Sequence, residues 1–384
     1  MIPLRNMRRF VRKARRQPLY AAGVFARRAR SYAWYRFGRG RSSPPEAITL
    51  FLTRRCNLKC RMCGQWGREG IAKKQSSQYI TTELGLDELQ RLIEGVSSFR
   101  PNITLFGGEP LLHRGCIALI RYIKERHMHC LMITNGFLIE EAAGAIVAAG
   151  LDEINVSIDG DAALHDEIRG MPGLFDTIMR GLKKLDAAKR ALNKKRPYVN
   201  LQCTMTRDNY RFLDRMIGVA REASADSLTF HNLIFLDKTL LERQKAYDAV
   251  LGCGSQDWEG FAFEPEIDPD TLYEHISGVL AGAYPFNVDV YPNFSLKGIR
   301  EYYAHPSSMP AGYPARCLSP WMVAYIFPDG EVRPCLNLDY SYGNIKRAPL
   351  GALWNNERAV RFRAMLKQNK IFPVCPRCTE LYRY

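Results

Sequence analysis

The middle of the chain alternates strand-like and helical patterns, and this alternation restricts its possible folds most strongly. Apolar runs typical of buried strands lie at Ala47–Thr53, Asn102–Phe106, His129–Thr134, Glu153–Ile158, Tyr198–Met205 and Ser227–Asn232. Amphipathic helical patterns separate them at Leu84–Ser98, Cys116–Glu125, Glu140–Ala149, Leu174–Leu192 and Tyr210–Ala223. Strands that alternate with helices form parallel sheets. We therefore expect an α/β fold with a parallel sheet of βα units, and a functional site at the carboxyl ends of the strands.

Three cysteines, Cys56, Cys60 and Cys63, follow the first of these strands at the spacing C-x3-C-x2-C. Three thiolates can ligate three irons of one cubane cluster and leave the fourth iron open to a small chelating cofactor. Iron–sulfur proteins that only carry electrons mostly close the cluster with four thiolates. A zinc knuckle or a set of reduced thiols is the alternative. Zinc requires four ligands, and no further Cys or His occurs within the next dozen residues.

Glycine-rich and polar motifs follow the later strands in a fixed order. These motifs are Gly107-Gly108-Glu109-Pro110, Thr134-Asn135-Gly136, Asn155-Val156-Ser157-Ile158-Asp159-Gly160 and His165-Asp166-Glu167-Ile168-Arg169-Gly170. Together with the three cysteines, they resemble the radical S-adenosylmethionine (radical SAM) superfamily. The resemblance implies a partial (β/α)6 TIM-type barrel over residues 46–235, with a [4Fe–4S] cluster on the three cysteines and SAM on its open iron.

The resemblance also implies which residues bind SAM. Gly107, Gly108, Glu109 and Pro110 would hold its amino group, Ser157 would contact it, and Met62 would lie beside its adenine. Arg169 would bind its carboxylate, because a guanidinium can bond a carboxylate bidentately. Asn135 and Asp159 complete the predicted cofactor-binding set. The resemblance identifies no catalytic acid or base.

A second cysteine pattern, C-x17-C-x39-C-x2-C, occupies the C-terminus and consists of Cys317, Cys335, Cys375 and Cys378. With Gly330 before the second cysteine, it resembles the auxiliary-cluster extension called SPASM or, in its shorter form, twitch. Tyr384 stands where the full pattern has another cysteine, so we expect one auxiliary [4Fe–4S] cluster on these four residues. A zinc ribbon is the alternative. Residues 317–384 are predicted to form a small α+β domain with a hairpin at Val323–Phe327 and Glu331–Pro334 and a helix from Gly351 through Met365.

Residues 236–316 are interpreted as a connector that contributes to the substrate pocket, with a helix at Asp268–Gly282 and a strand at Asn287–Tyr291. The remaining cysteines are Cys116, Cys130, Cys203 and Cys253. The first three lie in apolar patterns and are predicted to be buried. Cys253, between two glycines of the connector, is expected to be an inert thiol. His231 and Asn232 close the sixth strand and are predicted substrate contacts.

The N-terminal arm, residues 1–45, holds thirteen Lys or Arg and no acid, whereas the whole chain carries +16, so the rest carries +3. Basic helices with interleaved aromatic residues are typical of membrane-surface anchors. We expect the arm to bind anionic lipid rather than nucleic acid; a solvated arm, or one docked on its own domain, is the alternative. No apolar run is long enough to span a bilayer. Thiolate clusters require a reducing compartment, which places the protein in the cytoplasm, with peripheral attachment to the inner membrane face.

The resemblance implies an enzyme that takes an electron from a flavodoxin- or ferredoxin-type donor, cleaves SAM to a 5′-deoxyadenosyl radical and abstracts a substrate hydrogen. A second cluster favours net oxidation or cross-linking. The arm favours a membrane-associated or lipid-linked substrate, and a peptide or protein substrate is the alternative. A hypothesis of another class is a non-catalytic iron–sulfur electron carrier.

Overall fold

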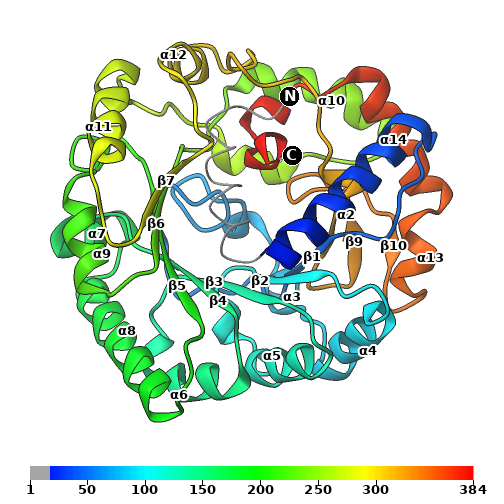
Figure 1. The fold of residues 1–384 in the computed structure, drawn as a ribbon. Coiled ribbons are helices and arrows are strands. Elements are labelled where there is room, and N and C mark those ends of the chain that lie inside the picture. Colours follow the sequence, from blue (N-terminus) through cyan, green and yellow to red (C-terminus); the bar gives the residue numbers. More distant parts are fainter. Residues whose placement is uncertain (1–17, 384) are drawn as a thin grey trace.

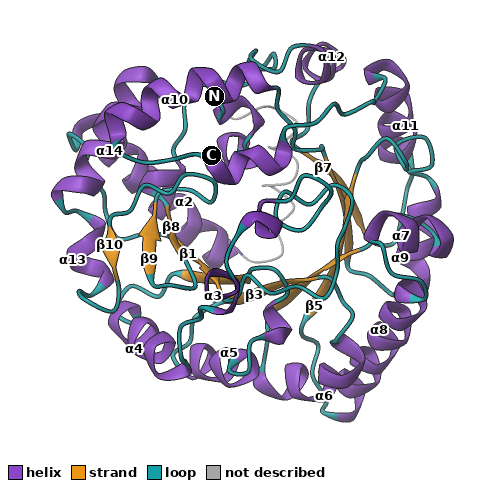
Figure 2. Cartoon of the chain, turned by 180° about the vertical axis from the view of Figure 1, so that it is seen from behind, coloured by secondary structure: helices purple, strands orange, loops and turns teal. Residues whose placement is uncertain are grey.

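A single curved sheet organises residues 18–383, which are the residues that the computed structural model describes. Its strand order is β10-β9-β8-β1-β2-β3-β4-β5-β6-β7. Figure 1 shows the strands curving as an incomplete barrel, with α4, α5, α6, α8 and α11 on the outside of the curve. Figure 2 shows the same arc of strands from behind.

The strands are short and mostly parallel. They are β1 (Ala47–Phe51), β2 (Asn102–Phe106), β3 (Cys130–Thr134), β4 (Glu153–Ser157), β5 (Tyr198–Thr204), β6 (Ser227–His231), β7 (Asn287–Tyr291), β8 (Val323–Ile326), β9 (Glu331–Arg333) and β10 (Gly343–Asn344). From β1 to β7 each strand pairs in parallel with the next, and β8 pairs in parallel with β1. The pairs β8–β9 and β9–β10 are antiparallel. The carboxyl ends of β1 to β8 therefore share one edge.

The helices follow the predicted alternation. They are α2 (Pro18–Phe37), α3 (Ser77–Thr81), α4 (Leu86–Val96), α5 (Cys116–Glu125), α6 (Ile139–Ala149), α7 (Ala162–Arg169), α8 (Leu174–Ala191), α9 (Arg215–Glu222), α10 (Lys238–Leu251), α11 (Pro269–Ala281), α12 (Leu296–Ala304), α13 (Leu350–Trp354) and α14 (Glu357–Asn369).

The two faces of the sheet differ in polarity because side chains alternate along a strand. On β4 and β5, Ile154, Val156 and Leu201 are wholly buried on one face. Burying each such side chain stabilises the fold by about 1.5–3 kcal/mol. The alternate residues, among them Asn155 and Gln202, are partly exposed. The apolar face lies under the helices, so the polar face lines the inside of the curve.

The predicted α/β fold is confirmed, and each of the six predicted strands is present within two residues of its expected limits. Four predicted helices are present within two residues of theirs, whereas α9 begins five residues late. The chain turns at Asn209, whose Oδ1 accepts a hydrogen bond from the Thr206 N–H at 2.7 Å. Helix α7 was not predicted. Asp161 caps its start, and its C-cap, Gly170, adopts a left-handed conformation with φ of 73°.

The sheet continues beyond the six predicted strands. β7, expected in a connector, pairs with β6, and the predicted hairpin β8–β9 is present and adds β8 to β1. The proposed domain limits stay predictions. The single helix expected from Gly351 through Met365 is wrong, because two helices are present. Asn356 interrupts them by accepting a hydrogen bond from the Ala359 N–H as the N-cap of α14.

The described part of the N-terminal arm is a helix, α2, fixed to the body. Its Tyr35 ring meets Trp321 edge-on at 5.0 Å, and the Arg36 carbonyl accepts a hydrogen bond from Lys367 Nζ at 2.9 Å. The alternative that the arm docks on its own domain therefore holds for α2, while residues 1–17 of the predicted arm lie outside the described residues. No helix within residues 18–383 has both the length and the apolar character needed to cross a bilayer.

Candidate functional site

The predicted cluster cysteines lie on one loop after β1, and neighbouring loops brace it. The Gly108 N–H donates to the Thr53 carbonyl at 2.8 Å, and the Glu109 N–H donates to the Arg55 carbonyl at 2.9 Å. On the other side, the Arg61 N–H donates to the Ile168 carbonyl at 3.0 Å. The loop is therefore held between the segments that follow β2 and β4.

Each of the three cysteine sulfurs accepts at least one N–H hydrogen bond. Cys56 Sγ accepts from the Leu58 N–H at 3.4 Å, and Cys63 Sγ accepts from the Trp66 N–H at 3.4 Å. Cys60 Sγ lies 3.7 Å from Arg169 Nη1. Burial raises the pKa of Cys56 to about 12, against the lowering effect of the Leu58 hydrogen bond. A bound metal would reverse that preference, because metal ligation stabilises the thiolate.

The three thiols are a donor set that suits an iron–sulfur cluster. Each thiolate of a cubane cluster bonds a different iron, so three cysteines leave the fourth iron open. Zinc prefers four ligands, and the zinc alternatives that the sequence left open stay predictions at this point.

The two glycines after β2 allow two loops to approach each other closely. A Cβ on Gly108 would lie 2.1 Å from the Arg55 carbonyl oxygen, and a Cβ on Gly107 would lie 2.6 Å from that of Thr53. Gly107 also has a φ of +154°. Packing against the cysteine loop is thus sufficient reason for both glycines, and their contact with SAM stays a prediction.

Glu109 ties the loop after β2 to the loop after β3. Its fully buried carboxylate accepts hydrogen bonds from Leu111 N at 3.0 Å, Thr134 Oγ1 at 2.8 Å and Asn135 N at 2.8 Å. Burial raises its pKa, and these three hydrogen bonds oppose the rise. The amide Nδ2 of Asn135 lies 3.8 Å from Cys56 Sγ. Glu109 thus positions a residue that contacts a cluster cysteine, whereas its own contact with SAM is untested.

Arg169 and Asp159 form a buried ion pair beside the cysteine loop. Asp159 Oδ2 lies 2.6 Å from Arg169 Nε, and Asp159 Oδ1 accepts from the Thr204 N–H at 2.8 Å. The Nη1 of Arg169 lies near Cys60, at 3.7 Å from the sulfur. This arrangement suits a guanidinium that binds a carboxylate next to the cluster.

Sequence reasoning did not single out His165, one helical turn before Arg169. His165 Nδ1 accepts from the Asp159 N–H at 3.1 Å, so the ring carries its proton on Nε2, for which no partner is found among the described residues. The ring is wholly buried, and burial followed by the Arg169 charge lowers its pKa to about 3. The spacing of the two residues, i and i+4 on a helix, was the available signal.

A polar wall lines the inside of β4 to β7. Two rows cross these strands in register: Ser157, Gln202, Thr229 and Asp289 in one, and Thr204, His231 and Tyr291 in the next. None of the four strands carries a Lys or Arg. The wall therefore offers hydroxyl, amide and imidazole groups and a single carboxylate.

The wall reaches the auxiliary cysteines through Tyr291. The Gln202 amide and the His231 imidazole are hydrogen-bonded, and the His231 and Tyr291 rings meet at 5.9 Å. The Tyr291 hydroxyl donates to the carbonyl of Thr379, next to Cys378, at 2.7 Å. Asn232, a predicted substrate contact, is instead buried and donates to the Pro292 carbonyl.

The four C-terminal cysteines converge from three segments, since Cys375 and Cys378 lie on the same turn. Burial raises the pKa of Cys335, and the neighbouring Cys378 and Cys317 raise it further. The pKa of Cys375 is likewise raised by burial and then by Cys378, while the Phe372 N–H donates to its sulfur at 3.3 Å. The four thiols thus form one partly buried group whose donor chemistry fits an auxiliary cluster.

The remaining sequence predictions concern single residues. Ser157 ends β4 at the functional edge, and Met62 is partly buried against the apolar core. The predicted burial of Cys116, Cys130 and Cys203 is confirmed.

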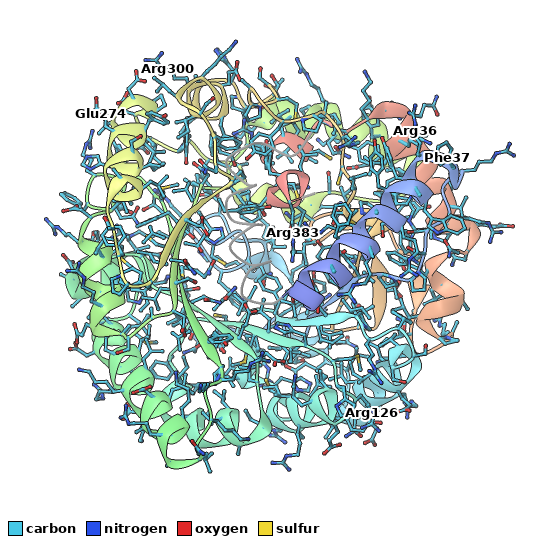
Figure 3. All side chains as sticks on the ribbon, viewed as in Figure 1. Arg36, Phe37, Arg126, Glu274, Arg300 and Arg383 are labelled. Atoms are coloured by element: carbon cyan, nitrogen blue, oxygen red, sulfur yellow. The ribbon has the colours of Figure 1, made fainter. Side chains whose placement is uncertain are left out.

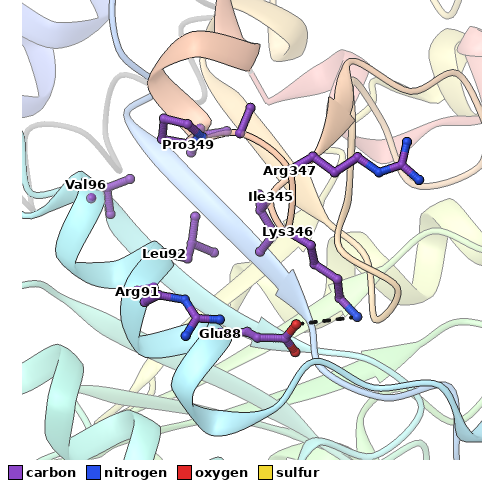
Figure 4. Close-up of a pocket in the computed structure, with 11 residues that line it drawn as sticks. Glu88, Arg91, Leu92, Val96, Ile345, Lys346, Arg347 and Pro349 are labelled. Carbon is purple, nitrogen blue, oxygen red and sulfur yellow. Dashed lines mark ion pairs between the residues drawn. The ribbon is translucent and has the colours of Figure 1, made fainter.

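Figure 4 shows a pocket of about 290 Å³ between α4 and residues 345–350. None of the predicted site residues lines it. Glu88 and Lys346, which form an ion pair at 3.6 Å, are among its lining residues. We therefore do not assign the pocket to the site.

Comparisons with known proteins agree with both cysteine patterns. A family model described as "Radical SAM superfamily" matches residues 50–195, and the SPASM model, "Iron-sulfur cluster-binding domain", matches residues 317–379. AdoMet-dependent heme synthase of Nitratidesulfovibrio vulgaris is 27% identical, over 86% of this chain and 84% of its own length. Fe-coproporphyrin III synthase of Methanosarcina barkeri is 29% identical over 56% of each chain.

Solved structures share the fold at low sequence identity. Streptococcus suis SuiB bound to S-adenosylmethionine superposes with a TM-score of 0.61 at 13% identity, over 88% of this chain and 71% of that one. The enzyme anSMEcpe with bound AdoMet gives 0.54 at 18% identity, over 82% of both chains. The chain therefore belongs to the radical SAM superfamily and carries a C-terminal SPASM domain, with SAM, a [4Fe–4S] cluster and an auxiliary iron–sulfur cluster as its cofactors.

Proposed function

We propose that this chain is a radical SAM enzyme that carries out a net oxidation or cross-linking of a substrate whose reacting part is polar. The observation that carries the proposal is the placement of the cysteine loop, the Asp159–Arg169 pair and the polar wall at one edge of the sheet. An electron carrier has no use for a buried arginine beside an open cluster or for a polar wall next to it.

Each group of site residues would have its own role in this reaction. Cys56, Cys60 and Cys63 would hold the cluster, and Arg169, oriented by Asp159, would bind the SAM carboxylate. When bound, the reduced cluster and SAM supply a 5′-deoxyadenosyl radical that abstracts a hydrogen atom from the substrate. Asn135 and Glu109 would keep the cysteine loop in place, and a substrate bound inside the curve of the sheet would exclude water from the reacting groups.

The polar wall supports a substrate part rich in hydroxyl, amide or carbonyl groups. Four strands without a Lys or Arg offer little to a group with several carboxylates, whereas Gln202, Asp289 and His231 suit uncharged hydrogen-bonding groups. The relatives named as synthases of porphyrins therefore do not by themselves indicate a porphyrin substrate here.

A membrane-associated or lipid-linked molecule with a polar head group fits both this wall and the basic N-terminal arm. A low-potential flavodoxin- or ferredoxin-type protein would supply the electron. A peptide is the second candidate, favoured by the fold shared with SuiB, whose structure has also been solved bound to the precursor peptide SuiA.

The test is 5′-deoxyadenosine formation under anaerobic conditions. Protein reconstituted with iron and sulfide, reduced with dithionite and given SAM should release 5′-deoxyadenosine, measured by mass spectrometry. Arg169→Lys should lower the rate at least about tenfold, because a lysine ammonium cannot form the two parallel hydrogen bonds that a guanidinium forms with a carboxylate. Arg180→Lys, on an exposed arginine of α8, is the matched control and should leave it unchanged. Wild-type protein with full iron content but no product would leave only the electron-carrier hypothesis.

A further inference from the structure

Helix α2 presents an unusually apolar outer face. Eleven of its described residues are exposed: Ala22, Phe25, Ala26, Arg28, Ala29, Arg30, Tyr32, Ala33, Trp34, Arg36 and Phe37. Eight of them are alanine or aromatic, three are arginine and none is acidic. Phe37 is 79% exposed, and Figure 3 shows it with Arg36 at the end of α2, pointing away from the body. We call these eleven residues the α2 outer face.

Helix α8, another surface helix of the chain, is built differently. Helix α8 exposes seven residues, Asp176, Arg180, Lys183, Lys184, Ala187, Arg190 and Ala191, of which five are charged. This is the usual pattern of a helix that faces water. Large apolar groups gathered on a surface are typical of an interaction site. We therefore expect the α2 outer face to bind a partner.

The inner face of α2 already accounts for its attachment to the body. Ser31 is buried, with its hydroxyl 3.5 Å from that of Ser43, and Tyr35 contacts Trp321. At the rim of the α2 outer face, Arg28 pairs with Glu46 at 3.6 Å, and the Arg316 guanidinium lies 5.2 Å from the Tyr32 ring. Phe37, in contrast, points away from the body.

The charge on and around the α2 outer face indicates what the partner is. Its charged residues are all arginine, and residues 1–45 hold thirteen Lys or Arg without an acid. Duplex nucleic acid would engage the arginines through its phosphates but would leave the alanines and the aromatic rings in water, since its bases are stacked on one another. An anionic bilayer satisfies both, because phosphate head groups pair with arginine while aromatic side chains enter the interface.

We propose that the α2 outer face binds the surface of an anionic lipid bilayer. Trp34 and Phe37 enter the interface, and Arg30 and Arg36 contact the head groups. This inference extends the proposed function. It rests on the proposed function only for the reason why the chain would bind a membrane, which is to bring a membrane-associated substrate to the polar wall. The binding itself requires no SAM chemistry.

The experiment is sedimentation of the full chain with vesicles of phosphatidylcholine containing 30% phosphatidylglycerol, beside vesicles of phosphatidylcholine alone. We expect at least tenfold stronger partitioning to the anionic vesicles. Trp34→Ser with Phe37→Ser should reduce it about tenfold or more, because two aromatic side chains leave the interface. The matched control is Leu192→Ser with Phe212→Ser, two exposed apolar residues far along the chain, which should bind like wild type.

A second α2 variant tests the proposal independently, in case the first variant misfolds. Arg30→Gln with Arg36→Gln keeps the aromatic residues and should lower binding to the anionic vesicles, as should added salt. Equal binding of wild type to both kinds of vesicle, or wild-type binding by either α2 variant, would overturn the proposal. Formation of 5′-deoxyadenosine without vesicles should be unchanged in all these variants, so failure of membrane binding is distinguishable from failure of the proposed enzyme activity.

Discussion

The buried pair of Asp159 and Arg169 gives the sharpest prediction, because its cost can be worked from the structure. Asp159→Asn keeps the side-chain size and the Oδ1 that accepts from the Thr204 N–H. It removes the negative charge 2.6 Å from Arg169 Nε, in a place where the Asp159 side chain is 0% exposed and that of Arg169 is 11% exposed. The substitution thus leaves a buried guanidinium without a counter-charge.

The magnitude follows from burial. Breaking a buried ion pair by removing one partner costs about 3–5 kcal/mol. The Glu140–Arg180 pair has a similar distance, 3.1 Å, but its side chains are 28% and 58% exposed. Exposed pairs contribute about 0–1 kcal/mol. Glu140→Gln should therefore cost several-fold less than Asp159→Asn, although each change neutralises one carboxylate.

The assay is urea unfolding of the cluster-free chain under reducing conditions, followed by tryptophan fluorescence. Asp159→Asn should lower the midpoint markedly without changing the slope. Adding Arg169→Gln should cost less than the sum of the two single changes, because no unpaired buried charge remains. If Asp159→Asn were no more destabilising than Glu140→Gln, the pair would not be buried and coupled as described.

Three further predictions test the site. Gly108→Ala places a Cβ 2.1 Å from the Arg55 carbonyl oxygen, so it should displace the cysteine loop and lower iron bound there, while the auxiliary iron persists in a chemical iron assay. Replacing all three cysteines of residues 56–63 by alanine should leave about four irons per chain if the auxiliary cluster is a cubane; near zero would contradict that cluster. His165, with its pKa lowered to about 3, cannot take up the proton that an unfolded histidine binds below about pH 6.5, so stability should fall on acidification. Between pH 6.5 and 5 the wild type should lose about 1.6 kcal/mol more than His165→Asn in urea unfolding, and parallel losses would refute the buried neutral ring.

The strands and most helices were predictable because their signals are local. A strand such as β2 carries its own alternation of apolar residues, and a helix such as α5 carries its own apolar stripe. Helix α7 was missed because its eight residues begin with two alanines and include four polar or charged side chains. Its evidence therefore lies in the caps Asp161 and Gly170. The pairing of β8 with β1 joins residues far apart in the chain, which no local pattern specifies.

The site, too, has one part that was predictable from the sequence and another that was not. The cysteines and glycines were predictable because chemistry and close packing demand those residue types. Glu109 shows what the sequence could not predict. Its motif predicted a contact with the cofactor, yet its carboxylate accepts hydrogen bonds from Leu111, Thr134 and Asn135. Hydrogen bonds of this kind depend on which loops meet at the edge of the sheet, and that is decided by the whole fold.

Two surfaces of opposite character bear on the substrate, and each constrains the other. The wall around Gln202, Thr229 and Asp289 would leave a hydrocarbon chain without a favourable contact and would leave its own polar groups without partners, which is costly when they are buried. The α2 outer face would gain nothing from a free polar metabolite. A molecule with a polar head and an apolar tail satisfies both, since only its head has to leave the membrane. If the substrate is of this kind, activity on its head group should rise when anionic vesicles are present. The rise should disappear in Trp34→Ser with Phe37→Ser, whereas formation of 5′-deoxyadenosine without vesicles should persist in that variant. A soluble peptide substrate would give the same rate with and without vesicles.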